Sequence, residues 1–273
     1  MEPKLQRRIQ RYGWDRAAAD YEHSWQRPLA PAQHRLLALA AIGPGERVLD
    51  VACGTGLVTF AAAEAVGAGG TVVGVDLSAA MVARAAASAE ARNLDRVRFE
   101  RMDAENLTLP AASFDVALCA LGLMYVPDPR QAIGEMARVL APGGRMVAAV
   151  WGQRSRCGWA EIFPIVDAQV KSEVCPMFFS LGTADRLSML CRDQGLSDVV
   201  TERIQTHLEW ASAEEACGAA FAGGPVALAY SRFDEHTRQI VHAQYLESIA
   251  AHRQGGGYAV PGEFVIVAGR KPV

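Results

Sequence analysis

The sequence predicts an α/β fold in which helices cover both faces of a doubly wound, mostly parallel sheet of seven strands. Two observations support this prediction. Short apolar runs alternate with helix-like segments over residues 46–151, and two more strand-like runs follow late in the chain. Near-continuous apolar strands are typical of a parallel sheet buried on both faces. Right-handed crossovers put helices on both sides and ligands at the carboxyl ends of the strands.

Each element of the central region has its own signal. A helix is expected from Leu57 to Val66 because a glycine-rich turn precedes it and glycines follow it. Ser78 is expected to cap a helix that reaches about Arg92. A further helix should start near Pro129 and stop before 142–144, Pro-Gly-Gly. The strands expected here are residues 47–51, 71–75, 97–102, 114–120 and 145–151.

The two ends of the chain are less regular, and we expect one overall domain. Residues 1–45 are predicted to form an N-terminal helical lid or cap over the 46–151 core. Residues 152–273 should supply helical elements that build a substrate pocket over the strand ends. Within them, runs at 199–210 and 262–270 predict two last strands, which would add an antiparallel edge strand to the sheet.

Composition excludes several classes of protein. About 51% of residues are apolar and the net charge is −3, so the basic field typical of nucleic-acid binders is missing. No apolar run approaches the roughly 20 residues of a membrane span, and no apolar segment follows Met1 as in a signal peptide. The six cysteines are scattered without metal-ligand spacing, so no metal site and a reduced, cytoplasmic protein are expected.

The main constellation is the turn after the first strand, Asp50-Val51-Ala52-Cys53-Gly54-Thr55-Gly56. Glycine lets a backbone approach a ligand without a Cβ in the way, and the next helix offers free N–H groups. Asp76 ends the second strand, twenty residues beyond Gly56. A carboxylate there can accept hydrogen bonds from both ribose hydroxyls of an adenosine. The pattern therefore predicts an adenosine-containing cofactor.

Two details separate the candidate cofactors. A dinucleotide fingerprint has a third glycine where this chain has Thr59. Asp50 precedes the loop, and its negative charge disfavours a pyrophosphate but suits a cationic amino acid and a sulfonium. The sequence thus favours S-adenosylmethionine over NAD.

With these residues the chain resembles the class I S-adenosylmethionine-dependent methyltransferases, in particular the group related to ubiquinone and menaquinone biosynthesis. The resemblance covers residues 10–151 and also rests on Arg138-Val139-Leu140-Ala141-Pro142-Gly143-Gly144 before the fifth strand. It implies a Rossmann-like fold, S-adenosyl-L-methionine as cofactor and S-adenosyl-L-homocysteine as product. The cofactor-binding residues that it implies are Asp50, Ala52, Cys53, Gly54, Thr55, Gly56, Asp76, Leu77, Met81, Met102, Asp103, Ala104, Cys119 and Leu121.

The predicted activity is methyl transfer to a small, apolar or aromatic acceptor, at oxygen, nitrogen, sulfur or carbon. Candidate substrate-facing residues are Tyr12, Tyr21, Tyr125 and Trp151. Where many relatives carry a histidine pair, this chain has Leu123-Met124-Tyr125, so no histidine base is predicted at that position.

Several alternatives stay open at this point. Cys157, Cys175 and Cys191 are candidate thiols for a metalloid substrate such as arsenite, although buried packing thiols are the simpler interpretation. RNA or protein methylation, an NAD-dependent oxidoreductase and a non-catalytic cofactor-binding subunit are the other rivals. A homodimer through the last strands is a further hypothesis.

Overall fold

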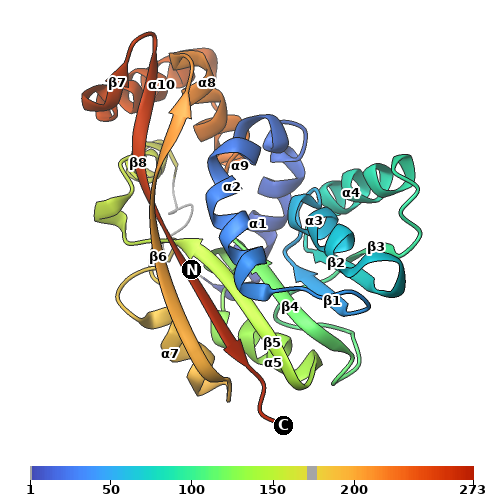
Figure 1. Ribbon diagram of the computed structural model, residues 1–273. Helices are drawn as coiled ribbons and strands as arrows, with labels where there is room; N and C mark the ends of the chain where they lie inside the picture. Colours follow the sequence, from blue (N-terminus) through green and yellow to red (C-terminus); the bar gives the residue numbers. More distant parts are fainter. Residues whose placement is uncertain (1, 171–176) are drawn as a thin grey trace.

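The computed structural model describes residues 2–170 and 177–273, which form one sheet with helices around it (Figure 1). The sheet order is β3-β2-β1-β4-β5-β8-β6, and β7 pairs with β8 outside this path. The strands are β1 (Arg47–Val51), β2 (Thr71–Asp76), β3 (Val97–Arg101), β4 (Phe114–Ala120), β5 (Leu140–Trp151), β6 (Ser197–Trp210), β7 (Arg253–Gln254) and β8 (Gly257–Arg270). The predicted seven-stranded sheet is confirmed, with β7 as a two-residue addition.

The first five strands are parallel and the last two complete the sheet as an antiparallel pair. Neighbouring strands β1 to β5 run parallel in register, for example Asp50 beside Gly74 and beside Leu118. Strand β8 runs antiparallel to β5 and to β6, so the antiparallel strand lies one place inside the edge. The expected antiparallel closure of the sheet is therefore confirmed. Strand β8 begins at Gly257 rather than 262, because residues 258–261 pair with β6 beyond the point where β5 ends.

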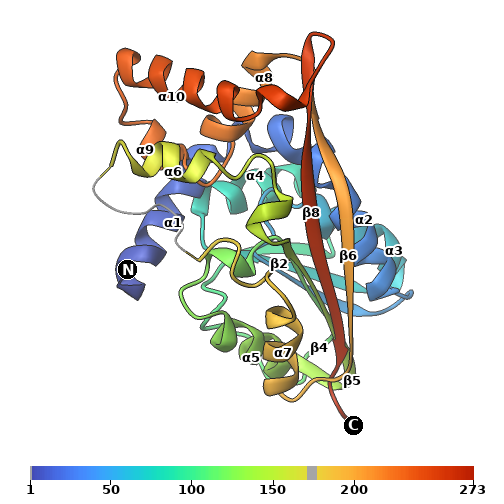
Figure 2. The ribbon, with the colours of Figure 1, turned by 90° about the vertical axis from the view of Figure 1, so that its left-hand side faces the viewer.

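Helices cover both faces of this sheet, as the doubly wound pattern predicts. Figure 2 shows α2 and α3 on one side and α5 and α7 on the other. The strands inside the sheet are buried along most of their length, as in β1, where four of five residues are buried. The edge strands β3 and β6 are mostly exposed or half-buried. The helices of the core and its flanks are α2 (Tyr21–Ala40), α3 (Leu57–Val66), α4 (Ala79–Ala91), α5 (Pro129–Val139) and α7 (Arg186–Asp193).

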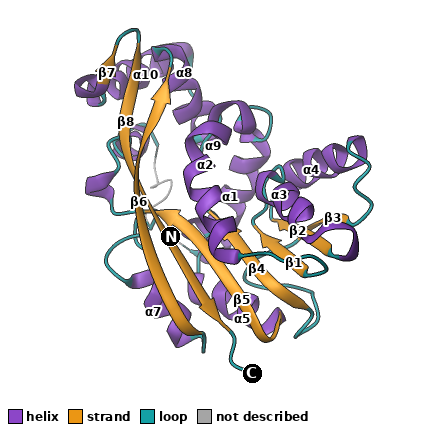
Figure 3. Cartoon of the chain, in the orientation of Figure 1, coloured by secondary structure: helices purple, strands orange, loops and turns teal. Residues whose placement is uncertain are grey.

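The remaining helices gather above the carboxyl ends of the strands (Figure 3). They are α1 (Pro3–Ala17), α6 (Ile162–Asp167), α8 (Ala213–Cys217), α9 (Ala227–Tyr230) and α10 (Glu235–Ser248). A π-helical turn, Gly218–Ala222, continues α8 towards α9. The N-terminal helical region is interrupted at 18–20. Across the ranges 2–170 and 177–273, no helix is long and apolar enough to cross a membrane.

Candidate functional site

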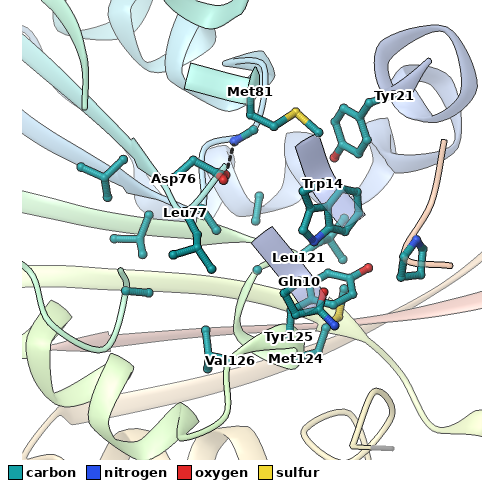
Figure 4. A pocket seen from close by; sticks show the side chains of 18 of the residues that line it. Gln10, Trp14, Tyr21, Asp76, Leu77, Met81, Leu121, Met124, Tyr125 and Val126 are labelled. Carbon is teal, nitrogen blue, oxygen red and sulfur yellow. Dashed lines mark hydrogen bonds between the residues drawn. The ribbon is translucent and has the colours of Figure 1, made fainter. Parts of the chain in front are cut away.

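A cavity lies at the carboxyl ends of β1 to β5, between the sheet and helices α1 and α2. It encloses about 1030 Å³, its open mouth included. Figure 4 shows Asp76 and Leu77 on one side of it and Trp14, Gln10 and Tyr125 on the other. The predicted cofactor residues that line it are Ala52, Gly54, Asp76, Leu77, Met81, Met102, Asp103, Ala104 and Leu121. The predicted edge of the sheet is thus where the structure has its large cavity.

The glycine-rich turn brings backbone close to this cavity. Gly54 and Gly56 both have positive φ, of 56° and 95°. Ala52 and Leu121, at the ends of β1 and β4, share this left-handed conformation, which residues with a Cβ seldom adopt. A Cβ at Gly56 would lie 2.8 Å from the Phe60 ring. Strained backbone of this kind is concentrated where a ligand is held.

Asp76 is fixed in the cavity wall by two backbone donors. Its Oδ2 accepts a hydrogen bond from the N–H of Gly54 at 2.9 Å, and its Oδ1 accepts one from the N–H of Ser78 at 2.8 Å. Burial raises the pKa of Asp76, while these two N–H groups lower it. Each carboxylate oxygen keeps a lone pair that can accept a further hydrogen bond from a ligand.

Asp50 lies behind the loop instead of in the cavity wall. It is 1% exposed, and its Oδ2 accepts a hydrogen bond from the Thr59 hydroxyl at 2.6 Å. Its Oδ1 has no hydrogen-bond partner within the described chain. Burial raises the pKa of Asp50 to about 7, against the opposing effect of Thr59. Thr59, which stands where a dinucleotide fingerprint has glycine, therefore holds this carboxyl group.

The other predicted loop residues that do not line the cavity support it from behind. They are Cys53, Thr55, Gly56 and Cys119. The Cys53 N–H donates a hydrogen bond to Val75 O at 3.0 Å, which ties the turn to β2. Cys119 is buried, and burial raises the pKa of its thiol to about 12. A Cβ at Gly122 would lie 2.9 Å from its sulfur atom, so Cys119 acts as a packing group here.

Helix α1 covers the cavity and is fastened at both ends. The Arg7 guanidinium contacts the buried Glu105 carboxylate at 2.8 Å and Asp103 at 3.1 Å. Near the end of the helix, Asp15 Oδ1 accepts a hydrogen bond from the Ser78 hydroxyl at 2.6 Å. Ser78 caps α4, as predicted. Helix α1 therefore closes the cavity with residues tied to the ends of β2 and β3.

Tyr12 requires a correction. It is 44% exposed, with the Arg11 guanidinium 5.4 Å from its ring centroid, and it does not line the cavity. The cavity-lining residues of α1 are Arg7, Gln10 and Trp14, which share one helix face at spacings of three and four. Tyr12 is two positions from both Gln10 and Trp14 and so points the other way.

Comparison with known proteins shows what kind of cavity this is. Residues 48–144 match the family model described as a methyltransferase domain. The chain is 31% identical to nocamycin O-methyltransferase of Saccharothrix syringae over 271 residues. The aligned region covers 94% of this chain and 96% of that relative. The chain belongs to the class I S-adenosylmethionine-dependent methyltransferases.

Further relatives agree with this assignment. Demethylmenaquinone methyltransferase of Bacillus cytotoxicus is 35% identical over 122 residues, 45% of this chain and 52% of that protein. This relative supports the predicted resemblance to the menaquinone-biosynthesis group. A candidate methyltransferase structure from Bacillus halodurans has the same fold, with a TM-score of 0.63 over 88% of this chain and 99% of that one, at 20% identity. Family membership decides between the two cofactors, S-adenosylmethionine and NAD, in favour of the former.

In this methyltransferase a continuous row of aromatic rings, which we call the aromatic band, lines the cavity. Neighbouring rings along it lie between 4.7 and 6.4 Å apart. The band begins beside the glycine-rich turn and ends over β5. Its members are Tyr21, Trp14, Tyr125, Phe178, Trp159, Trp25 and Trp151.

Three of the predicted substrate-facing residues, Tyr21, Tyr125 and Trp151, belong to the aromatic band of the methyltransferase. Trp25, Trp159 and Phe178 were not among the predicted site residues. Tyr21, Trp25 and Leu29 recur every four residues on α2, a spacing that could have indicated one shared face. No local spacing in the sequence connects Trp159 or Phe178 to this site.

The cysteines give the metalloid alternative no geometric support. Cys157 and Cys191 are buried on separate elements and do not line the cavity. Burial raises the pKa of the Cys157 thiol to about 11 and of the Cys191 thiol to about 12. Cys175 lies outside the described residues. In the part of the methyltransferase that the structure describes, no group of three or more metal-binding side chains is found.

Proposed function

We propose that this methyltransferase transfers a methyl group to an oxygen atom of a small, flat and mostly apolar acceptor. One observation supports this most directly. A single cavity joins a partly buried, oriented carboxylate, Asp76, to the aromatic band that ends at Trp151. The chain is also similar, over nearly its full length, to a relative named as an O-methyltransferase.

The residues around the glycine-rich turn fit S-adenosylmethionine. Asp76 has two lone pairs available for ribose hydroxyls, and Asp103 lies next along the cavity wall, where it would accept from the adenine amino group. Leu77 and Met102 give an adenine ring apolar contacts. Gly54 has no side chain, so a ligand can approach its backbone. A Cβ built there would lie 3.7 Å from Cε1 of Tyr21.

The order of the strands supports a placement for the two halves of the reaction. Asp76 and Asp103 follow β2 and β3 at one end of the parallel sheet, whereas Trp151 ends β5 at the other. Gly54 and Leu121 follow the strands between them. The cofactor should therefore extend from β3 towards β4, and the acceptor should lie over β5.

When bound, S-adenosylmethionine supplies an electrophilic methyl group on a sulfonium. The protein's part is to hold an acceptor in line with that group and to exclude water, and orientation of this kind is worth roughly 7–11 kcal/mol in favourable cases. The rings of the aromatic band provide flat, apolar walls for both tasks. The Tyr21 hydroxyl stays protonated at neutral pH, because burial and the nearby Asp76 and Asp50 raise its pKa. It therefore serves as a hydrogen-bond donor in the cavity wall.

A transfer assay tests the proposal. Radiolabelled S-adenosylmethionine would be incubated with the protein and, separately, with phenols, naphthols, quinols and aromatic acids, and with total tRNA and a protein extract. We expect label in at least one small aromatic compound and recovery of an O-methyl product. Label confined to tRNA or protein would refute the acceptor class and leave the cofactor assignment intact.

A further inference from the structure

The acceptor end of the cavity contains two buried hydrogen-bond donors without partners. Trp25 is 6% exposed and Trp159 is 4% exposed, and both line the cavity. Neither indole Nε1 has a hydrogen-bond partner among the residues that the structure describes. Their ring centroids are 6.4 Å apart, so one small molecule can span both rings.

An unpartnered buried N–H is unusual, because most buried polar groups in folded proteins are hydrogen-bonded. An indole N–H can only donate. Whatever satisfies Trp25 and Trp159 must therefore present an acceptor atom. Both tryptophans line a cavity that is otherwise walled largely by rings, so a ligand of that cavity is a candidate for the missing partner.

The loop that contains Gly224 packs beside the nitrogen side of the Trp25 ring. A Cβ built on Gly224 would lie 3.8 Å from Cζ2 of Trp25, the ring carbon on the side of the indole nitrogen. Gly224 and Pro225 themselves line the cavity. Because residue 224 is glycine, this loop places backbone, and no side chain of its own, against that part of the ring.

We propose that Trp25 and Trp159 select the acceptor by donating hydrogen bonds to oxygen atoms that only accept, such as a ring carbonyl or an ionised hydroxyl group, on a flat aromatic molecule. This inference rests on the proposed function and narrows its substrate class. An aromatic compound of the same shape but without such an oxygen fills the apolar walls and leaves two donors unpaired, so the site rejects it.

The chain contains a matched internal control in Trp210. It is 3% exposed and its Nε1 also has no partner within the described ranges, but it lies on β6 and does not line the cavity. The sequence has five tryptophans, so a sample labelled with ¹⁵N at the indole nitrogen gives five N–H resonances. Substitution of each tryptophan by phenylalanine assigns them.

The experiment compares 9-fluorenone with fluorene, which have the same ring skeleton and differ by one carbonyl oxygen. The protein is first saturated with S-adenosylhomocysteine, whose binding is measured by calorimetry. Each probe is then titrated while the five indole resonances are followed. We expect fluorenone to move the Trp25 and Trp159 resonances downfield, fluorene to leave them unshifted in that direction, and Trp210 to stay in place.

Affinity provides a second readout. Trp25→Phe and Trp159→Phe keep an aromatic ring and remove the donor, so each should weaken fluorenone binding by about tenfold, the equivalent of one hydrogen bond. The affinity for fluorene should fall less than the affinity for fluorenone, because fluorene loses ring contact but no hydrogen bond. Binding of S-adenosylhomocysteine should stay unchanged, which also shows that the variants are folded. Trp210→Phe should change none of these affinities.

The outcomes distinguish a failure of the proposed function from a failure of the inference about Trp25 and Trp159. Failure to bind S-adenosylhomocysteine would refute the proposed function. If it binds, the inference is overturned when fluorenone binds no better than fluorene, when it binds without moving the two resonances, or when the phenylalanine variants bind both probes as the wild type does.

Discussion

Asp76→Ala provides the sharpest test of the cofactor site. The wild-type carboxylate is held by the N–H groups of Gly54 and Ser78, at 2.9 and 2.8 Å, so it meets a ligand in a fixed position. Alanine removes the acceptor for both ribose hydroxyls and leaves the two N–H groups without their partner. A hydrogen bond to a charged group contributes about 1.5–3 kcal/mol. Loss of one to two of them, partly replaced by water, predicts a Kd for S-adenosylhomocysteine that rises about 100-fold.

Two further substitutions provide a weaker effect on cofactor affinity and a control without one. Asp103 is 29% exposed and is engaged by Arg7, so Asp103→Ala should weaken binding by only about three- to tenfold. Asp115 is similarly exposed and pairs with Arg47 at the start of β4, away from the cavity, so Asp115→Ala is the control and should leave the Kd unchanged.

Titration calorimetry measures the three affinities, and the melting temperature of each free variant shows whether it is folded. The reasoning about Asp76 is refuted if folded Asp76→Ala binds S-adenosylhomocysteine within threefold of the wild type. It is also refuted if Asp115→Ala loses as much affinity as Asp76→Ala, because the effect would then not come from the site.

Three other predictions concern residues around the cavity. The folded protein holds the Asp50 proton more tightly than the unfolded chain, because folding raises the pKa of this carboxyl group from 3.8 to about 7. As the pH rises from about 4 to about 7, Asp50→Asn should therefore gain up to about 4 kcal/mol of unfolding free energy relative to the wild type. Calorimetric curves of stability against pH that run parallel for the two proteins would contradict this. A Cβ at Gly122 overlaps with Ala52, so Gly122→Ala should lower stability by about 1–3 kcal/mol in denaturant titrations, whereas Gly218→Ala, whose Cβ would meet nothing within 4 Å, should not. Asp15→Ala removes the two hydrogen bonds that hold α1 to the start of α4, from the Ser78 hydroxyl and the Ala80 N–H, and should speed S-adenosylhomocysteine release about tenfold in stopped-flow fluorescence. An unchanged rate would mean that α1 does not control release.

Most of the fold could be predicted because it is determined locally. A buried parallel strand needs an apolar run, and the turn after β1 needs glycine at positions with positive φ, so both appear as short patterns in the sequence. The sequence does not predict the start of β8, because Tyr258 to Pro261 pair with β6 beyond the end of β5, and no apolar alternation distinguishes that stretch.

The site residues also divide into those that local sequence patterns predict and those that they do not. Ala52, Gly54, Asp76 and Asp103 lie at the ends of strands, where position along the chain decides position in space, and the structure places all four in the cavity wall. The aromatic character of Tyr12 alone predicts a contact with the substrate, but the helical period puts Tyr12 on the outer face of α1. That period puts Trp14, and not Tyr12, on the inner face.

The aromatic band could not be predicted because it is assembled over long range. Trp25 comes from α2, Trp151 from the end of β5, and Trp159 from a loop 134 residues beyond Trp25. Their rings meet only because β5 is central to the sheet and α2 crosses its face. A single-sequence pattern has no means of joining such segments.

This division also explains why the cofactor is so much easier to infer than the acceptor. The cofactor contacts proposed here come from backbone turns and carboxylates at β1 to β4, whereas the acceptor contacts come from side chains of separate segments over β5. Substitution of a ring such as Phe178 changes the acceptor wall without touching Gly54 or Asp76. In this arrangement one half of the sheet can hold the methyl donor unchanged while the other half sets which molecule receives the methyl group.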